Sequence, residues 1–318
     1  MRVMVTGGGG LIGAKIVRRL LADGLDVVSL DVSADQPRLE ALAGDARLAC
    51  IGCDIREAGA IHEAIRANGV DRIVHMAALL GPTTENEPAL GFSVNVLGAA
   101  NVFEAAGKAG VARVCYATSI AVYDDQSAYG AATVVDESSH RNPYSLYGHA
   151  KVMNEETAKV VARNTGLDIR GLRIAAVFGH GRATGRSSAI SRMISAAAVG
   201  ESAMSDVAAT QPAPMIYVDD VAECMTRLCL AGRLAHPVYC GPSAVATVQD
   251  AVDAIHRWIP DAELGFEDAA AAYPSILHVS DARWVAEIGY APPSFADRVR
   301  DQIDEARAER GLPPLAGR

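Results

Sequence analysis

The chain has 318 residues, of which 50% are hydrophobic and 21% are charged, and its formal net charge is −9. This length allows a large core in one α/β domain or in two lobes, and the composition is ordinary for a soluble globular protein. The negative charge argues against nucleic acid or an anionic membrane as the main partner. No apolar run reaches the length of a membrane span, and the N-terminus enters a strand without a secretory signal. We therefore expect a cytoplasmic protein.

The first predicted elements are a strand, a glycine turn and a helix. Residues 2–6 form an apolar run, and residues 14–22 carry apolar side chains at helical spacing. Between them, Gly7, Gly10 and Gly13 keep a G-x-x-G-x-x-G spacing. These glycines would turn the chain, admit a pyrophosphate close to the backbone and let the helix pack on the strand, while the helix N-terminus holds the phosphate charge. A flexible loop is the alternative, but the flanking strand and helix favour dinucleotide binding.

The next acidic residues suggest how the adenosine half of a dinucleotide is held. Asp31 closes a second predicted strand, residues 26–31, and lies 18 residues after Gly13, where an acid meets the ribose hydroxyls. A 2′-phosphate would be repelled there and no arginine follows directly, so the sequence favours NAD over NADP; a solvated acid at a strand end is the alternative. Asp54 follows a third strand, residues 48–51, and is placed to accept from the adenine amino group.

A helix over residues 58–67 precedes a fourth strand, residues 71–75, whose end at Met76–Leu79 is built of residues that leave room for a cofactor. The helix predicted over residues 88–108 has no charge between Ala89 and Phe103. Such a helix is buried on every side, so part of it should face the sheet and the rest a second subunit. Asn95 interrupts this stretch and needs hydrogen-bond partners.

A fifth strand, residues 111–118, ends at Ser119, and a polar connection of residues 124–142 is long enough to lie over the site. A helix running to about residue 164 and a sixth strand, residues 168–174, follow. This alternation predicts an α/β fold with a Rossmann-like doubly wound parallel sheet. Later elements are expected at 187–199, 214–218, 221–230, 238–240, 247–258 and 295–310. We expect residues 1–175 to form the NAD-binding domain, with 215–240 returning to it, and residues 176–214 and 241–318 to form a smaller C-terminal substrate-binding lobe.

Three residues suggest a reaction. Tyr147 and Lys151 are four apart on one helix and share a face. An ammonium about 4 Å away, at an effective dielectric of about 20, is worth roughly 4 kcal/mol, or about three pKa units, to a phenolate. Tyr147 could then take a proton from a substrate hydroxyl while hydride leaves the same carbon, and Ser119 could orient the substrate oxygen. An isolated Tyr-x-x-x-Lys is usually a surface pair, but its place after an NAD domain favours catalysis.

These motifs together resemble the extended short-chain dehydrogenase/reductase family of NAD-dependent epimerases and dehydratases. The resemblance covers roughly residues 1–240 and includes His75–Ala78, Asn95–Gly98, Ser119–Tyr123 and Val218-x-Asp220. It implies a catalytic triad of Ser119, Tyr147 and Lys151, and a homodimer formed through the helices at 88–108 and 145–164. The cofactor-binding residues expected are Gly7, Gly10, Leu11, Ile12, Gly13, Asp31, Asp54, Ile55, Met76, Ala77, Ala78, Asn95, Ala117, Tyr147, Lys151, Ile174 and Val177. The substrate-binding residues expected are Leu79, Ser119, Ile120, Ala121, Tyr147, Ala176, Arg182 and Arg186.

Departures from the family pattern narrow the reaction. By this resemblance, the dehydratases of the family carry an Asp-Glu pair where this chain has Ile120 and Ala121. The nucleotide-sugar enzymes carry an asparagine where this chain has Ala176. Their diphosphate-binding arginine is also missing before the strand at 214–218. Residues 180–192 instead hold four basic side chains and no acid, a run that could bind a substrate carboxylate or form an ordinary solvated helix face.

The first hypothesis is an NAD-dependent dehydrogenase that oxidises a secondary alcohol of a small polar substrate, such as a sugar or sugar acid. The second is a sugar or nucleotide-sugar epimerase that keeps NAD tightly bound, and the third is an NAD-sensing regulator without turnover. We expect no metal, because Cys50 and Cys53 have the spacing of a metal pair but no second pair or histidine cluster accompanies them.

Overall fold

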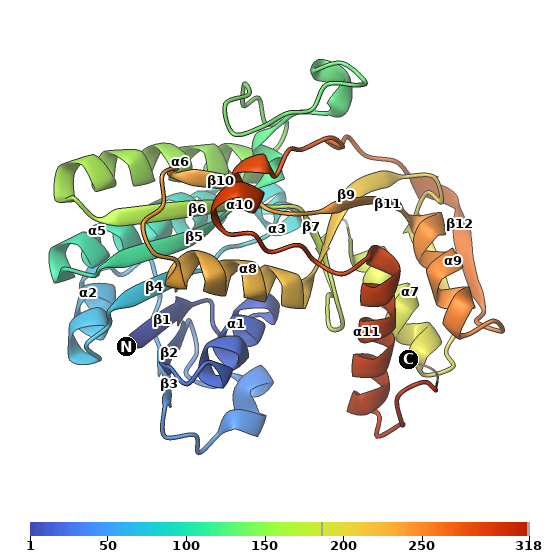
Figure 1. Cartoon of the computed structure of the whole chain (residues 1–318), viewed down its shortest axis with the longest axis horizontal. Coiled ribbons are helices and arrows are strands. Elements are labelled where there is room, and N and C mark those ends of the chain that lie inside the picture. Colours follow the sequence, from blue (N-terminus) through green and yellow to red (C-terminus); the bar gives the residue numbers. More distant parts are fainter. Residues whose placement is uncertain (186, 317–318) are drawn as a thin grey trace.

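The computed structural model describes residues 1–185 and 187–316 (Figure 1). Within them, seven strands form one sheet in the order β10-β6-β5-β4-β1-β2-β3, and every pair is parallel. This confirms the Rossmann-like doubly wound sheet. The strands are β1 (Arg2–Thr6), β2 (Asp26–Asp31), β3 (Leu48–Gly52), β4 (Arg72–His75), β5 (Arg113–Ser119), β6 (Asp168–Ile174) and β10 (Val238–Cys240).

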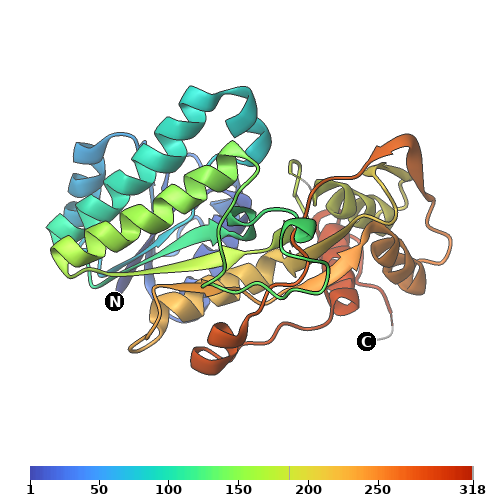
Figure 2. The same cartoon turned by 90° about the horizontal axis from the view of Figure 1, so that it is seen from above.

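Helices cover both faces of this sheet, as Figures 1 and 2 show. One face carries α1 (Leu11–Ala22) and α8 (Val218–Leu230), which pack on each other. The other carries α2 (Ala58–Ala67), α5 (Ala99–Ala109) and α6 (Leu146–Thr165) side by side. In α1 the buried side chains recur at helical spacing, at Ile16, Val17, Leu20 and Leu21, so one apolar stripe meets the strands. The strand order reverses between β1 and β4, and cofactors bind at the carboxyl ends of strands at such a point.

The helix predicted over residues 88–108 is present but not uniform. It consists of α4 (Pro88–Phe92), a π-helical stretch (Ser93–Gly98) and α5, and together these are long and apolar enough to cross a membrane by length and composition, although 44% of that apolar window is buried. Part of it is not buried within this chain, since Phe92 is 62% exposed and Leu97 is 48% exposed, and the contact of that part with a second subunit stays a prediction. A short helix not anticipated from the sequence, α3 (Gly81–Asn86), precedes it.

The remaining residues form a smaller lobe. Among the described residues it holds a sheet of β11 (Ala244–Thr247), β9 (Pro212–Tyr217) and β7 (Ala176–Phe178), and a two-stranded pair of β12 (Leu264–Ala271) and β8 (Ala203–Val207). Around them lie α7 (Ser188–Ala198), α9 (Val248–Trp258) and α11 (Phe295–Glu309), whereas α10 (Ala282–Glu287) packs beside β10 of the main sheet. The prediction that residues 238–240 rejoin the main sheet is confirmed, because β10 pairs with β6.

The connection of residues 124–142 does not lie over the cavity described below, since none of its residues lines it. It packs instead on the segment 273–280, where Val135 and Val279 form a parallel bridge. Buried Gln126 accepts from the backbone N–H groups of Leu277 and His278 at 3.0 Å each. Its length therefore serves to hold that segment rather than to cover the site.

Candidate active site

The glycine loop has the shape needed to receive a dinucleotide. Gly7 has a φ of +69°, and a Cβ there would lie 2.7 Å from the backbone nitrogen of Ala77, so β1 and the end of β4 approach too closely for a side chain. A Cβ on Gly13 would lie 2.0 Å from the carbonyl oxygen of Gly7. Helix α1 begins immediately after Gly10, with no side-chain cap on its N-terminus. The loop is thus a cradle of bare backbone against an uncapped helix end, which suits a pyrophosphate.

Asp31 is fixed beside this loop. One carboxylate oxygen accepts from the N–H of Gly9 at 3.0 Å, and the other accepts from the N–H of Val32 at 2.8 Å. Beneath it, buried Gln36 hydrogen-bonds with Ser29 and fills the space under the loop. The arrangement fits the predicted contact with ribose hydroxyls. The sequence analysis missed Gln36, because its contact with the second strand depends on how the connection after Asp31 folds back.

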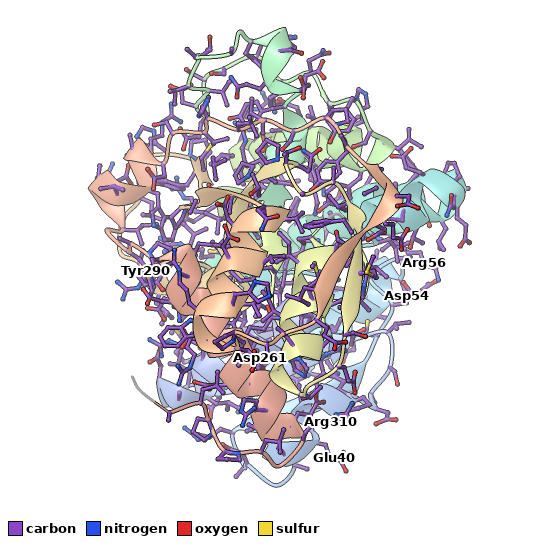
Figure 3. All side chains as sticks on the ribbon, turned by 90° about the vertical axis from the view of Figure 1, so that its right-hand side faces the viewer. Glu40, Asp54, Arg56, Asp261, Tyr290 and Arg310 are labelled. Carbon is purple, nitrogen blue, oxygen red and sulfur yellow. The ribbon has the colours of Figure 1, made fainter. Side chains whose placement is uncertain are left out.

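Asp54 and Arg56 lie next to each other at the surface, as Figure 3 shows, and the guanidinium binds the carboxylate through two nitrogens. The hydrogen bonds from Arg56 hold the pKa of Asp54 below its ordinary value. Ile55 is buried and would meet any Cβ added to Gly98, so it anchors this strand end to the helix at residues 93–109.

Asn95 finds the partners that its burial requires. Its side-chain oxygen accepts from the N–H of Leu79 at 2.7 Å, and its nitrogen donates to the carbonyl of Leu79 at 2.9 Å and to Thr84. Because its amide is engaged with the segment after β4, Asn95 holds that segment in place.

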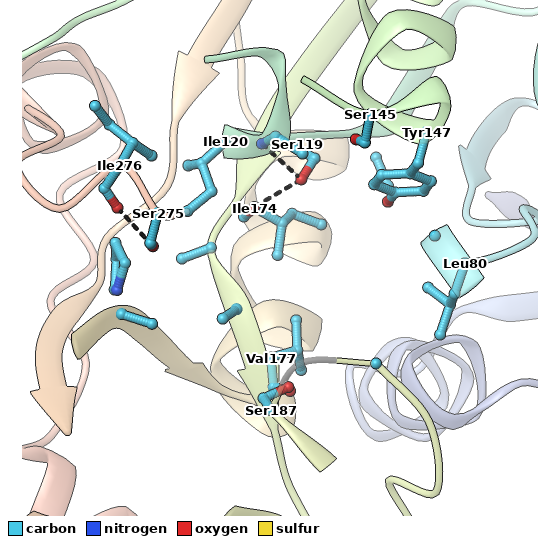
Figure 4. A pocket seen from close by; sticks show the side chains of 18 of the residues that line it. Leu80, Ser119, Ile120, Ser145, Tyr147, Ile174, Val177, Ser187, Ser275 and Ile276 are labelled. Carbon is cyan, nitrogen blue, oxygen red and sulfur yellow. Dashed lines mark hydrogen bonds between the residues drawn. The ribbon is translucent and has the colours of Figure 1, made fainter. Parts of the chain in front are cut away.

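A cavity of about 430 Å³ opens at the carboxyl ends of β4, β5 and β6, and Figure 4 shows part of its lining. The predicted residues that line it are Ile12, Met76, Ala117, Ser119, Ile120, Ala121, Tyr147, Ile174, Ala176, Val177 and Arg182. Leu79 does not line it; the next residue, Leu80, does, since the backbone of Leu79 is held by Asn95. Arg186 lies outside the described residues.

Local capping positions the tyrosine. The hydroxyl of Ser145 accepts from the N–H of Gly148 at 3.1 Å, and Glu85 accepts from the N–H of Leu146 at 2.7 Å, so the first turn of α6 is fixed. Tyr147 then points into the cavity on the side opposite Ile276, as Figure 4 shows. Ser119 ends β5, and its hydroxyl oxygen accepts from the N–H of Ala121 at 3.1 Å.

Lys151 lies below the cavity rather than in its lining. Its ammonium donates to the carbonyl of Ala117 at 2.9 Å and is 5.3 Å from the centroid of the Tyr147 ring. The side chain is buried, and burial lowers the pKa of Lys151 to about 8. Folding therefore places an ammonium where a neutral amine would be more stable. A buried side chain with a pKa shifted in this way is common at functional sites.

The electrostatics of Tyr147 differ from the simple two-residue picture. Burial raises the pKa of Tyr147, and the positive charge of Arg182 and a hydrogen bond with Ser119 both act to lower it. From the sequence, Arg182 is expected to bind the substrate, and Lys151 is expected to be the side chain that lowers the pKa of Tyr147. In the structure the cation that acts to lower the pKa of Tyr147 is Arg182, which the segment after β7 brings into the cavity lining.

A buried network behind α6 was also missed. Glu155, one turn beyond Lys151, binds Arg173 of β6 at 2.7 Å and accepts from Thr118 at 2.9 Å. Burial alone would raise the pKa of Glu155. Hydrogen bonds and charge from Arg173 nevertheless hold that pKa below its ordinary value. The face of α6 that carries Tyr147 is thereby fixed to β5 and β6. The i, i+4, i+8 spacing of Tyr147, Lys151 and Glu155 is the signal that could have identified it.

The fold and the glycine cradle define a Rossmann-type dinucleotide-binding protein. Residues 3–239 match the NAD dependent epimerase/dehydratase family. The chain belongs to this family and is an extended short-chain dehydrogenase/reductase, an enzyme whose cofactor is NAD. Membership in a family of enzymes removes the support for a regulator without turnover.

Three similar proteins illustrate the range of the family. The chain is 30% identical over 226 residues to a putative UDP-glucose 4-epimerase of Methanocaldococcus jannaschii, covering 70% of this chain and 71% of that relative. It is 31% identical over 183 residues to a uronate dehydrogenase of Pseudomonas putida, covering 56% and 61% of the two chains. The solved structure of MoeE5 in complex with UDP-glucuronic acid and NAD has a TM-score of 0.81 and 25% identity, and the match covers 98% of this chain and 100% of that one.

Proposed function

We propose that this protein is an NAD-dependent dehydrogenase that oxidises a secondary alcohol of a small polar substrate, with the sugar acids as the starting class. The observation that carries this proposal is the convergence of the Ser119 and Tyr147 side chains on one cavity at the carboxyl ends of β5 and β6, with the Lys151 ammonium buried beneath them. A cofactor-binding domain alone does not require a phenol and a serine at the same cavity.

In this mechanism Tyr147 is the general base and Ser119 orients the substrate oxygen. The glycine loop and Asp31 would hold the pyrophosphate and adenosine ribose of NAD, which supplies the hydride acceptor. Tyr147 takes the proton of the substrate hydroxyl, and the positive charges of Lys151 and Arg182 stabilise the phenolate that does so. The bare-backbone cradle fits this cofactor, since a Cβ on Gly13 would fill it.

The arginine on the cavity wall supports a substrate with a carboxylate. Arg182 lines the cavity, whereas Ala176 and Pro214 occupy positions where an asparagine and a nearby arginine would serve a nucleotide diphosphate. A guanidinium binds a carboxylate through two parallel hydrogen bonds, which suits a small acid. One relative is named a uronate dehydrogenase, and a uronate is a substrate that carries a carboxylate.

An epimerase is the second candidate, favoured by the 30% identity to a putative UDP-glucose 4-epimerase. It would use the same residues to oxidise and then reduce one carbon, leaving NAD unchanged. The test is to follow NADH absorbance with NAD in excess. A dehydrogenase accumulates NADH in proportion to the substrate consumed, whereas an epimerase forms an isomer with no net NADH.

The role of Tyr147 has a direct test. In the variant Tyr147→Phe, kcat should fall by about 10²–10⁴-fold, because the proton acceptor is lost. The matched variant Tyr129→Phe removes a phenol that does not line the cavity and should retain activity. Equal activity of Tyr147→Phe and the natural enzyme would refute the assignment.

We also propose that the enzyme is a homodimer. Phe92 and Leu97 are exposed on the helix before α5, and Met153 and Val160 are 50% and 44% exposed on the adjacent α6. A second copy would cover these side chains with the same surface. Met153→Glu should give monomers in sedimentation, whereas the control Val285→Glu, on exposed α10, should not. Sedimentation of the natural enzyme as a monomer at micromolar concentration would refute the proposal.

A further inference from the structure

The cavity holds one cation without an acidic partner among the described residues, Arg182. Its Nε is buried and makes no hydrogen bond within the described chain. Gly185 keeps space for it, because a Cβ there would lie 2.8 Å from one of its terminal nitrogens. Glu85 is the other charged residue in the described lining, and its carboxylate caps α6 through the N–H of Leu146. The guanidinium is therefore the charge available to a ligand.

Most hydroxyl groups around the cavity already donate their protons to the protein. The donors are paired with a carboxylate or with backbone carbonyls: Thr118 with Glu155, Tyr123 with Asp136, Tyr144 with Pro274, Ser187 with Val177 and Ser275 with Ile276. A polyhydroxylated substrate needs several donors and acceptors, and each substrate hydroxyl without a partner would lose its hydrogen bonds to water. Of the remaining described hydroxyls, Ser119 makes a long contact with the carbonyl of Ile174 at 3.5 Å, and Ser145 accepts from the N–H of Gly148. These two side chains and Tyr147 therefore provide for few substrate hydroxyls beyond the reacting one.

The wall beyond Ser119 is mostly apolar; the hydroxyl of Ser275 also lies in it and donates to the backbone carbonyl of Ile276 at 3.1 Å. Ile120 and Ile276 lie on one side of Ser119 and Tyr147 lies on the other, as Figure 4 shows, and Ala213 and Pro214 are further apolar residues of the lining. Ile276 is only 4% exposed.

The segment that carries Ile276 is fixed. Asp125 accepts from the N–H of Ser275 at 2.9 Å, and Gln126 accepts from the next two N–H groups at residues 277 and 278. The apolar wall is consequently a built feature of the site, and a segment held in this way resists moving aside for a polar group.

We propose that the substrate is a small 2- or 3-hydroxy acid whose carboxylate binds Arg182 and whose remaining group is short and apolar and lies against Ile120 and Ile276. This rests on the proposed dehydrogenase function and, within its class of small polar substrates, replaces the sugar acids taken as the starting class by monohydroxy acids. Arg182 and Tyr147 line the same cavity of about 430 Å³, which fits a carboxylate one or two carbons from the carbinol carbon. In the reaction the carbinol C–H bond breaks and its hydride passes to NAD, while Tyr147 takes the hydroxyl proton. The products are a keto acid, NADH and a proton.

The test compares four-carbon acids that differ only in hydroxylation. NADH formation is measured with both enantiomers of 2-hydroxybutyrate and 3-hydroxybutyrate and with the stereoisomers of 2,3,4-trihydroxybutyrate. The best monohydroxy acid should exceed the best trihydroxy acid in kcat/KM by about 10–100-fold. In Ile276→Ser this ratio should fall by about tenfold, and Ile120→Ser, on a different segment, should act in the same direction. The control Val245→Ser changes an exposed valine outside the lining and should leave the ratio unchanged.

Binding is measured separately from turnover. Butyrate has the carboxylate and the apolar chain but no hydroxyl, and with NAD present it should raise the melting temperature of the natural enzyme and not that of Ile276→Ser. This result without NADH from any acid would support the acid site and refute the dehydrogenase function. Equal or better turnover of the trihydroxy acid would overturn the inference and leave the dehydrogenase function intact. The inference would also be overturned if butyrate did not bind and no monohydroxy acid were turned over.

Discussion

Replacing Lys151 by methionine should stabilise the protein while it destroys activity. The ammonium is buried, and its pKa falls from the ordinary 10.5 to about 8 in the folded chain. At about 1.4 kcal/mol for each pKa unit, carrying the charge into the fold costs roughly 3 kcal/mol of stability below pH 8. Methionine has a similar length and no charge, so Lys151→Met should recover much of this, less the hydrogen bond to Ala117.

The lowered pKa of Lys151 also predicts how the stability difference between the natural enzyme and Lys151→Met changes with pH. Between about pH 8 and 10.5 the unfolded chain keeps the Lys151 proton and the folded chain has lost it, so the natural enzyme gains stability as the pH rises. The advantage of Lys151→Met should therefore be largest near neutral pH and disappear above the unfolded pKa. At neutral pH the same variant should lose catalysis by about 10²-fold or more, because the phenolate loses a stabilising charge.

The assay is urea unfolding of cofactor-free protein at several pH values, for the natural enzyme, Lys151→Met and the control Lys159→Met. Lys159 is on the same helix, half-exposed and paired with Glu156, so its replacement should change the free energy of unfolding by less than about 0.5 kcal/mol. A stability difference between Lys151→Met and the natural enzyme that does not change with pH would refute the reasoning.

Three further predictions concern the cofactor and the base. Gly13→Ala should destabilise the loop by about 1–3 kcal/mol and weaken NAD binding in calorimetry, since its Cβ would lie 2.0 Å from a carbonyl oxygen; Gly59→Ala meets nothing within 4 Å and should stabilise α2 by about 0.5–1 kcal/mol. Arg182→Met should move the pH dependence of kcat to higher pH, because burial then raises the pKa of Tyr147 with less opposition, and an unchanged profile would contradict this. Asp31→Ala should weaken NAD more than NADP, since the carboxylate that meets the ribose is lost; equal losses would contradict that role.

The sequence predicts those features of the fold and site that depend on the spacing of residues close together in the chain. The glycine spacing, the acid at the end of β2 and the i, i+4 pair on α6 each fix a geometry within one or two elements. Their elements were found with bounds within a few residues, as were most helices. The short strands of the smaller lobe were missed, because three to eight residues with no clear alternation leave no periodic signal.

What the sequence could not predict depends on contacts between distant segments. The wall at Ile276 is positioned by Asp125 and Gln126, about 150 residues earlier in the chain. Likewise the effect of Arg182 on Tyr147 arises only because the fold brings both side chains into the lining of one cavity. The sequence also could not say which side of the uncharged helix holds the exposed Phe92, because an uncharged helix face has the same composition whether it meets the core or another subunit.

The most direct test of the account is a crystal structure of the enzyme with NADH and a bound acid. The account predicts that the substrate carbinol or keto carbon lies about 3–3.5 Å from C4 of the nicotinamide, with its oxygen in hydrogen-bond reach of both Tyr147 and Ser119. A nicotinamide bound on the far side of the cavity, with the Tyr147 hydroxyl directed to bulk solvent, would contradict it.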